Sequence, residues 1–174
     1  NQMINEIDNI NSFLDNANKP NMAIVGGSKI STKIQLLNNL IEQFSVVAIG
    51  GAMANTFLLA NNYNVGKSLV EKDLTQEANN IQLKAKKSNC ELILPTDVLC
   101  GKNIHDTNPV NCNIHEISPE EMILDIGQTS TEMINNKIIN SKMVLWNGPV
   151  GAFEFKPYDK ATNAIANNIK VNAK

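Results

Sequence analysis

The sequence predicts a doubly wound, Rossmann-like α/β fold, in which helices cover both faces of a parallel sheet. Two observations support this prediction. Short runs that are apolar throughout recur along the chain, and segments with apolar residues at helical spacing lie between them. Wholly apolar strands are typical of parallel sheets that are buried on both faces. We therefore expect right-handed crossovers between neighbouring strands.

The first half of the chain contains two of these strand and helix pairs. Apolar spacing predicts a helix over residues 4–17, which ends before Pro20. The run 22–25 predicts strand one, and a second helix follows it with one apolar face made of Ile30, Ile34, Leu37 and Ile41. The run 46–49 predicts strand two, and a short helix is expected over residues 56–60.

The second half continues the alternation with one interruption. A helix is expected around residues 74–85, and the stretch "ELILP" predicts strand three, which Pro95 ends. Residues 96–119 are polar, so we expect a loop or small edge elements there. A helix over residues 133–138 then leads to strand four, "KMVLW", and a last helix runs from about residue 158. No repeat or linker divides the chain, so we expect residues 1–174 to form a single α/β domain. We expect this domain to be incomplete.

Composition narrows the class of protein. The net charge of -2 gives no electrostatic support for binding nucleic acid or a membrane, and no apolar run reaches the roughly 18 residues of a spanning helix. All 15 basic residues are lysines, so any anion must be held by ammonium groups or backbone amides. Three cysteines without a CxxC pair indicate a reducing, cytoplasmic setting and idle thiols.

Glycine-bearing turns follow three of the predicted strands: "GGSK", "GGAM" and "NGPVG". Ligands of doubly wound sheets bind at the carboxyl ends of the strands, where glycine allows close backbone approach. Lys29 and Lys33 are four residues apart, so we expect both on one side of the first turn of the second helix. The pattern predicts a phosphate or nucleotide site. The alternative is that the glycines only turn the chain and the lysines are solvated.

Three other motifs carry little weight. "GKS" at residues 66–68 lacks the earlier glycine of a P-loop and follows a helix. The spacing of Cys100, His105, Cys112 and His115 matches no usual zinc site, so we expect no protein-bound metal. No GxGxxG follows a strand, which disfavours a nicotinamide-dependent oxidoreductase.

The motifs "GGSKISTK", "GGAMANTFL", "LPTDV", "LDIG" and "WNGPVGAFE" stand in this order along the chain. With them the sequence resembles the phosphoglycerate kinase family, specifically most of its C-terminal, nucleotide-binding domain. The resemblance implies a glycolytic phosphotransferase that moves a phosphoryl group between 1,3-bisphosphoglycerate and ADP, giving 3-phosphoglycerate and ATP with Mg²⁺. It also implies that strand one lies beside strand four and that the parent enzyme is a monomer.

The resemblance also implies a set of site residues. Lys29 would stabilise charge on the transferring phosphoryl group as the catalytic residue, because such catalysis is mostly electrostatic. The residues implied at the phosphates are Gly27, Ser28, Lys29 and Lys33. Those implied beside the base are Gly50, Gly51, Ala52, Leu69 and Leu124. The pocket is completed by Asn147, Gly148, Pro149 and Ala152, with Glu154 at the ribose hydroxyls.

Several positions depart from the family pattern. Ser28 stands where the family usually has alanine, Ala52 where it has a third glycine, and Gln128 where it favours proline. The family's later "GGGDT" motif, whose aspartate holds the metal, has no match here. The N-terminal domain, with its basic patch for the phosphoglycerate and its catalytic arginine, has none either. We therefore expect no turnover by these residues alone, and the alternative function is a stand-alone, non-catalytic nucleotide-binding module.

Overall fold

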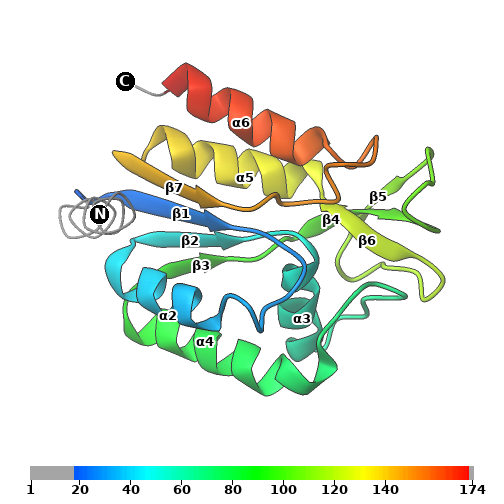
Figure 1. Cartoon of the computed structure of the whole chain (residues 1–174), viewed down its shortest axis with the longest axis horizontal. Coiled ribbons are helices and arrows are strands. Elements are labelled where there is room, and N and C mark those ends of the chain that lie inside the picture. Colours follow the sequence, from blue (N-terminus) through cyan, green and yellow to red (C-terminus); the bar gives the residue numbers. More distant parts are fainter. Residues whose placement is uncertain (1–17, 173–174) are drawn as a thin grey trace, which may run out of the picture.

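A parallel four-stranded sheet forms the centre of the computed structural model, which describes residues 18–172 (Figure 1). The strand order is β3-β2-β1-β7. The strands are β1 (Asn21–Val25), β2 (Val46–Ile49), β3 (Glu91–Ile93) and β7 (Met143–Asn147). This confirms the predicted fold class and the pairing of strand one with strand four. The helix predicted over residues 4–17 lies outside the described residues.

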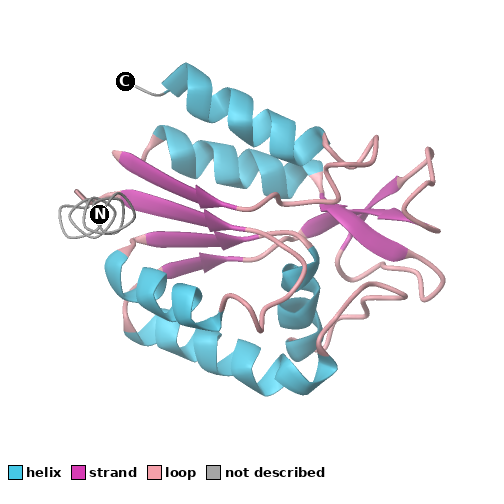
Figure 2. Ribbon diagram, in the orientation of Figure 1, coloured by secondary structure: helices cyan, strands magenta, loops and turns pink. Residues whose placement is uncertain are grey.

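Helices cover both faces of this sheet (Figure 2). One face packs against α2 (Ile34–Gln43), α3 (Ala52–Ala60) and α4 (Thr75–Lys87), the last preceded by the short 3-10 helix η1 (Lys72–Leu74). The other face packs against α5 (Gln128–Ile139) and α6 (Lys160–Asn172). Along β1, Ala23 and Val25 point to the first layer, whereas Met22 and Ile24 point to the second. Both faces of β1 are therefore buried, which explains its wholly apolar sequence.

The strand register brings three strand ends to one edge of the sheet. Val25 pairs with Asn147 of β7 on one side and with Ile49 of β2 on the other. The glycine-bearing turns that follow these residues therefore start at the same level. Because parallel strands share their direction, the three turns meet beyond one edge.

A second, antiparallel sheet lies beyond the carboxyl ends of β1, β2 and β7 (Figure 1). Its order is β5-β4-β6, with β4 (Asp97–Gly101), β5 (Val110–Asn113) and β6 (Met122–Ile126). Small elements were expected within residues 96–119, but as edge elements. β4 is instead the central strand, and its Val98 and Cys100 are fully buried against α3 in a separate core cluster. β6 was not predicted.

Asp97 fixes this second sheet to α5. Its carboxylate accepts hydrogen bonds from the backbone N–H groups of Ser130 at 2.7 Å and Thr129 at 3.0 Å, in the first turn of α5. The Ser130 hydroxyl donates to the same carboxylate at 2.6 Å. An acceptor on one strand thus caps the start of a helix from elsewhere in the chain. This contact holds the second sheet at the edge of the first.

Element boundaries differ from the prediction at two glycine-bearing turns. α3 begins at Ala52, directly after the glycine pair, rather than at residue 56. α2 begins at Ile34, so Ile30 precedes the helix although it is fully buried. Among residues 18–172, no helix is both long enough and apolar enough to cross a membrane.

Candidate functional site

The first glycine-bearing turn packs directly against the turn that follows β7. The Gly26 N–H donates to the Asn147 carbonyl at 2.9 Å. A Cβ on Gly26 would lie 1.9 Å from the Pro149 carbonyl oxygen, which no side chain can do. The "GGSK" and "NGP" turns are therefore in direct backbone contact, and glycine is required at residue 26 for this contact.

The second glycine-bearing turn, "GGAM", forms hydrogen bonds with both of the other turns. The Gly51 N–H donates to the Val150 carbonyl at 2.7 Å, and the Met53 N–H donates to the Gly27 carbonyl at 3.0 Å. Gly51 has a φ of +67°, and a Cβ there would lie 2.5 Å from the Gly27 oxygen. At Gly50 a Cβ would lie 2.6 Å from the Val150 Cβ atom. Sequence-distant backbone segments thus form one continuous rim.

Lys29 and Lys33 lie next to this rim, but not on a helical turn, so that expectation was wrong. Residues 31–33 form a turn before α2, closed by a hydrogen bond of 2.8 Å from the Lys33 N–H to the Ile30 carbonyl. Lys33 has a φ of -123°, outside the helical range, and only caps α2. The Lys33 ammonium group donates to the Asn147 Oδ1 atom, so it crosses from "GGSK" to "NGP". Lys29 is exposed on the preceding loop.

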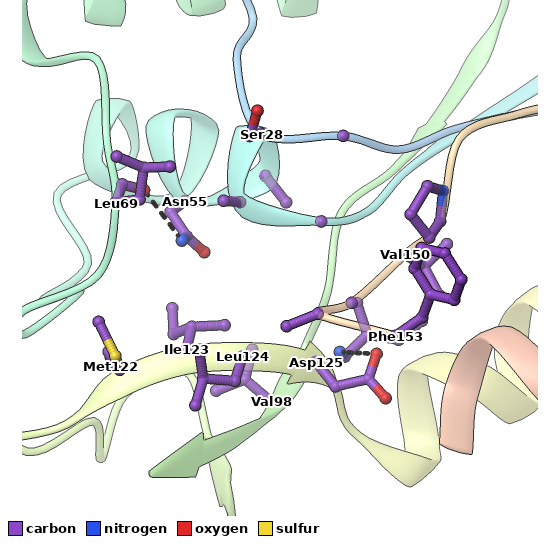
Figure 3. Close-up of a pocket in the computed structure, with 18 of the residues that line it drawn as sticks. Ser28, Asn55, Leu69, Val98, Met122, Ile123, Leu124, Asp125, Val150 and Phe153 are labelled. Carbon is purple, nitrogen blue, oxygen red and sulfur yellow. Dashed lines mark hydrogen bonds between the residues drawn. The ribbon is translucent and has the colours of Figure 1, made fainter. Parts of the chain in front are cut away.

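A cavity of about 490 Å³ opens between the rim and the second sheet (Figure 3). Nine of the implied site residues line it: Gly27, Ser28, Gly51, Ala52, Leu69, Leu124, Pro149, Ala152 and Glu154. Five others lie beside it without lining it: Lys29, Lys33, Gly50, Asn147 and Gly148. Lys33 contacts Asn147 of "NGP", and Gly50 packs against Val150. Gly27 and Pro149, which line the cavity, belong to the two turns that are in contact.

The wall opposite the rim is apolar and was largely missed by the sequence analysis. Met122, Ile123 and Leu124 of β6 line the cavity, and Val98 of β4 lies behind them (Figure 3). Phe153 lines the cavity as well and is 47% exposed. The signal available in the sequence was the run "MILDI", which reads as a strand once its aspartate is accepted within it.

Asn55 contributes a polar atom to this otherwise apolar region. It is fully buried on α3, and its Nδ2 group donates to the Leu69 carbonyl at 3.1 Å. Its Oδ1 atom has no hydrogen-bond partner among the described residues. A buried acceptor without a partner is unfavourable, so the α3 side of the cavity adds a polar group opposite the apolar wall, which suits a ligand with both apolar and polar groups.

Asp125 is the buried charge of the site. It lies on β6 and is 2% exposed, and its carboxylate accepts hydrogen bonds from the N–H groups of Ile126 at 2.9 Å and Ala161 at 3.1 Å. A Cβ on Gly151 would lie 2.1 Å from the Asp125 Oδ1 atom. Burial, with a smaller contribution from the charge of Asp159, raises the pKa of Asp125 to about 7, although the two hydrogen bonds lower it. Asp125 therefore joins β6, the start of α6 and the loop after "NGP".

The possible zinc ligands do not form a metal site. Within residues 18–172, no group of three or more His, Cys, Asp or Glu side chains is arranged to hold a metal ion. The Cys100 and Cys112 thiols contact each other at 3.5 Å, and burial raises the pKa of both. Thiols with raised pKa values are poor metal ligands and poor nucleophiles.

Comparisons with known proteins agree on one family. The family model described as phosphoglycerate kinase matches residues 1–174. Relatives named phosphoglycerate kinase from Rhodospirillum centenum and Caulobacter vibrioides are 43% and 42% identical over 162 and 173 residues, respectively. The matches cover 92% and 99% of this chain but only 41% and 44% of those proteins. The chain thus spans less than half the length of these relatives.

Solved structures support the same assignment. The structure of phosphoglycerate kinase from Coxiella burnetii has a TM-score of 0.93 and 35% sequence identity, covering 98% of this chain and 44% of that one. The crystal structure of the enzyme from Pyrococcus horikoshii has a TM-score of 0.79 at 20% identity, which supports the fold alone. The chain therefore belongs to the phosphoglycerate kinase family.

Proposed function

We propose that this chain is the Mg-nucleotide-binding part of a cytoplasmic, glycolytic phosphotransferase that uses 1,3-bisphosphoglycerate and ADP. The observation that carries this proposal is the meeting of three glycine-bearing turns and two lysines beside a mostly apolar cavity. A nucleotide has an apolar base, polar ribose hydroxyls and anionic phosphates. Each of these parts has a matching surface within this one region.

The phosphates would bind beside the contact between the "GGSK" and "NGP" turns. Lys33 donates to Asn147 there, and Lys29 is exposed on the loop before it. Two ammonium groups supply the positive charge that an arginine-free chain cannot take from guanidinium groups. Lys29 would stabilise the charge of the transferring phosphoryl group, where positioning and electrostatics do most of the catalytic work.

The base and ribose fit the cavity. Ala52 and Leu69 line one side and Leu124 lines the other, which suits the two faces of a planar base. Glu154 lines the same cavity and would accept hydrogen bonds from the ribose hydroxyls. The Oδ1 atom of Asn55, on α3 near Leu69, adds an acceptor that has no hydrogen-bond partner among residues 18–172.

Magnesium would arrive with the nucleotide rather than bind to a cluster of protein ligands. No cluster of three or more metal-binding side chains stands among residues 18–172. When bound, Mg²⁺ would supply positive charge that offsets the charge of the phosphates. The residues of this chain would bind the base, ribose and remaining phosphate charge.

We further propose that the chain alone does not turn over substrate, because the sugar-acid substrate would bind to a separate N-terminal domain. A coupled assay for Mg-dependent ATP formation from 1,3-bisphosphoglycerate tests this. Rates at the blank level are expected, and ATP formation above the blank would contradict the proposal. The same sample should bind Mg-ADP, reported by the fluorescence of Trp146, the only tryptophan. Its Nε1–H group donates to the carbonyl of Gly148 in "NGP" at 2.7 Å.

A further inference from the structure

Glu71 holds the loop that carries the two lysines. It lies just before η1, and its Oε2 atom accepts a hydrogen bond of 3.0 Å from the Ser31 N–H. The Ser31 hydroxyl donates to the other carboxylate oxygen at 2.5 Å. Partial desolvation raises the pKa of Glu71, but the hydrogen bonds from Ser31 and from the Ile30 backbone, with the charge of Lys29, lower it overall. The carboxylate is therefore ionised and occupied by donors from residues 30–31.

Glu71 is itself attached to α3. Its backbone N–H donates to the Thr56 hydroxyl at 3.1 Å, and two residues earlier the Leu69 carbonyl accepts from Asn55 at 3.1 Å. Asn55 and Thr56 are both buried on α3, which begins at the second glycine-bearing turn. A chain of hydrogen bonds thus runs from α3 through residues 69–71 to the loop of residues 28–33, which we call the lysine loop.

We infer that Glu71 is a positioning residue, which holds the loop of residues 28–33 so that Lys29 and Lys33 face the phosphates of a bound nucleotide. This inference rests on the function proposed above. Ser31 lies midway between the two lysines, so holding its backbone limits the movement of both side chains. Without Glu71, Ile30 would remain buried, but the exposed residues 31 and 32 would keep only the bonds of the turn itself.

The negative charge of Glu71 argues for this role rather than for direct contact with the ligand. A free carboxylate beside a phosphate site would repel the phosphates. Here three donors and a neighbouring ammonium group offset the charge, so Glu71 acts on the ligand only through the loop. Its effect should therefore be selective for ligands that carry phosphates.

The test compares Glu71→Gln with Glu120→Gln in the full 174-residue chain. Both substitutions remove one carboxylate charge, but Glu120 is exposed and forms a surface ion pair with Lys67 rather than hydrogen bonds with Ser31. Affinities for Mg-ADP and for adenosine are measured by titration of Trp146 fluorescence. For Glu71→Gln we expect about tenfold weaker binding of Mg-ADP, the loss typical of a charge-assisted hydrogen bond, and adenosine binding within about twofold of wild type. For Glu120→Gln we expect neither affinity to change.

Two outcomes of this titration would overturn the inference. One is equal Mg-ADP affinity in Glu71→Gln and Glu120→Gln. The other is an equal loss for adenosine and Mg-ADP, which would indicate general damage to the site. Ser31→Ala removes only the hydroxyl donor and serves if Glu71→Gln does not fold; its Mg-ADP affinity should fall about threefold while that for adenosine holds.

A protease experiment separates this inference from the proposed function. Trypsin cleavage after Lys29 and Lys33, followed by mass spectrometry, should be faster in Glu71→Gln than in Glu120→Gln because the loop is released. A wild-type chain that binds neither ligand would overturn the proposed function. In that case, equal cleavage rates in the two variants would also contradict the claim that Glu71 restrains the loop of residues 28–33.

Discussion

The glycine rim and the β5-β4-β6 sheet line opposite sides of the same cavity, but the rim does so with backbone atoms and the sheet with side chains. The rim is mostly backbone: residues 26–27, 50–51 and 148–151 approach within hydrogen-bonding distance of one another. The opposite wall consists of apolar side chains on β6 and β4. The rim can present backbone amide groups to a ligand and lets the ligand approach the backbone closely. The wall provides only an apolar contact surface.

This difference predicts how each region tolerates substitution. Backbone that touches backbone cannot relax around an added Cβ atom, because neither partner has a rotamer to change. An apolar wall can repack, and its losses scale with the volume removed. Substitutions at rim positions where a Cβ would clash should therefore unfold the protein or abolish binding, while those in the wall should lower stability and base affinity gradually.

The largest effect is expected from Gly51→Ala. Its φ of +67° and ψ of -174° belong almost only to glycine, and the new Cβ would lie 2.5 Å from the Gly27 oxygen. We expect a loss of about 4 kcal/mol in the free energy of unfolding, measured by urea denaturation. Gly27→Ala is the matched control, because its φ is also positive at +131° but its nearest contact would be 4.0 Å away. Equal losses in the two variants would contradict the close-contact explanation.

The next effect concerns Asp125, where rim and wall meet. Its folded pKa of about 7 lies above the unfolded value of 3.8, so the folded state binds more protons between these values. Stability should therefore fall as pH rises from about 4 to about 7, by on the order of 3 kcal/mol. Urea denaturation at several pH values measures this slope. Asp125→Asn should flatten it, and an unchanged slope in the variant would assign the pH dependence to other groups.

A smaller effect is expected in the wall. Leu124 is 9% exposed and lines the cavity, so Leu124→Ala should cost about 2 kcal/mol of stability, the low end for a buried leucine. Because this side chain faces the proposed base, adenosine and Mg-ADP should lose affinity by the same factor. Parallel titrations of the two ligands measure this. A loss confined to Mg-ADP would place the base elsewhere.

The main sheet could be predicted because its strands follow simple rules. Residues 22–25 and 46–49 are buried on both faces, so no polar residue interrupts their pattern. β4 and β6 each contain an aspartate at a buried position; the sequence of β4 predicts a loop or small edge elements, and β6 was not predicted. Asp97 is satisfied by the start of α5, and Asp125 by the start of α6. Those partners are distant in sequence, so no local pattern indicates them.

Some residues of the candidate site could likewise be predicted from the sequence, and others could not. The rim glycines could be predicted because glycine-bearing turns follow three of the predicted strands, and this repetition favours a ligand site over simple chain reversal. The turn of residues 31–33 overrode the helical spacing of the two lysines, since Glu71 holds Ser31 from 40 residues away. The residues of the wall, such as Met122 and Ile123, look like ordinary core residues in the sequence. Only the three-dimensional structure places them opposite the rim.

The measurement that tests the account most directly is a calorimetric titration of the 174-residue chain with Mg-ADP, repeated on Lys33→Ala. Lys67→Ala is the matched control, because Lys67 is an exposed lysine in a surface ion pair. We predict saturable binding by the wild type, a loss of about 1–3 kcal/mol in binding free energy for Lys33→Ala, and no loss for the control. A folded wild-type chain that binds no Mg-ADP, or equal affinity in all three proteins, would contradict a nucleotide site at the rim.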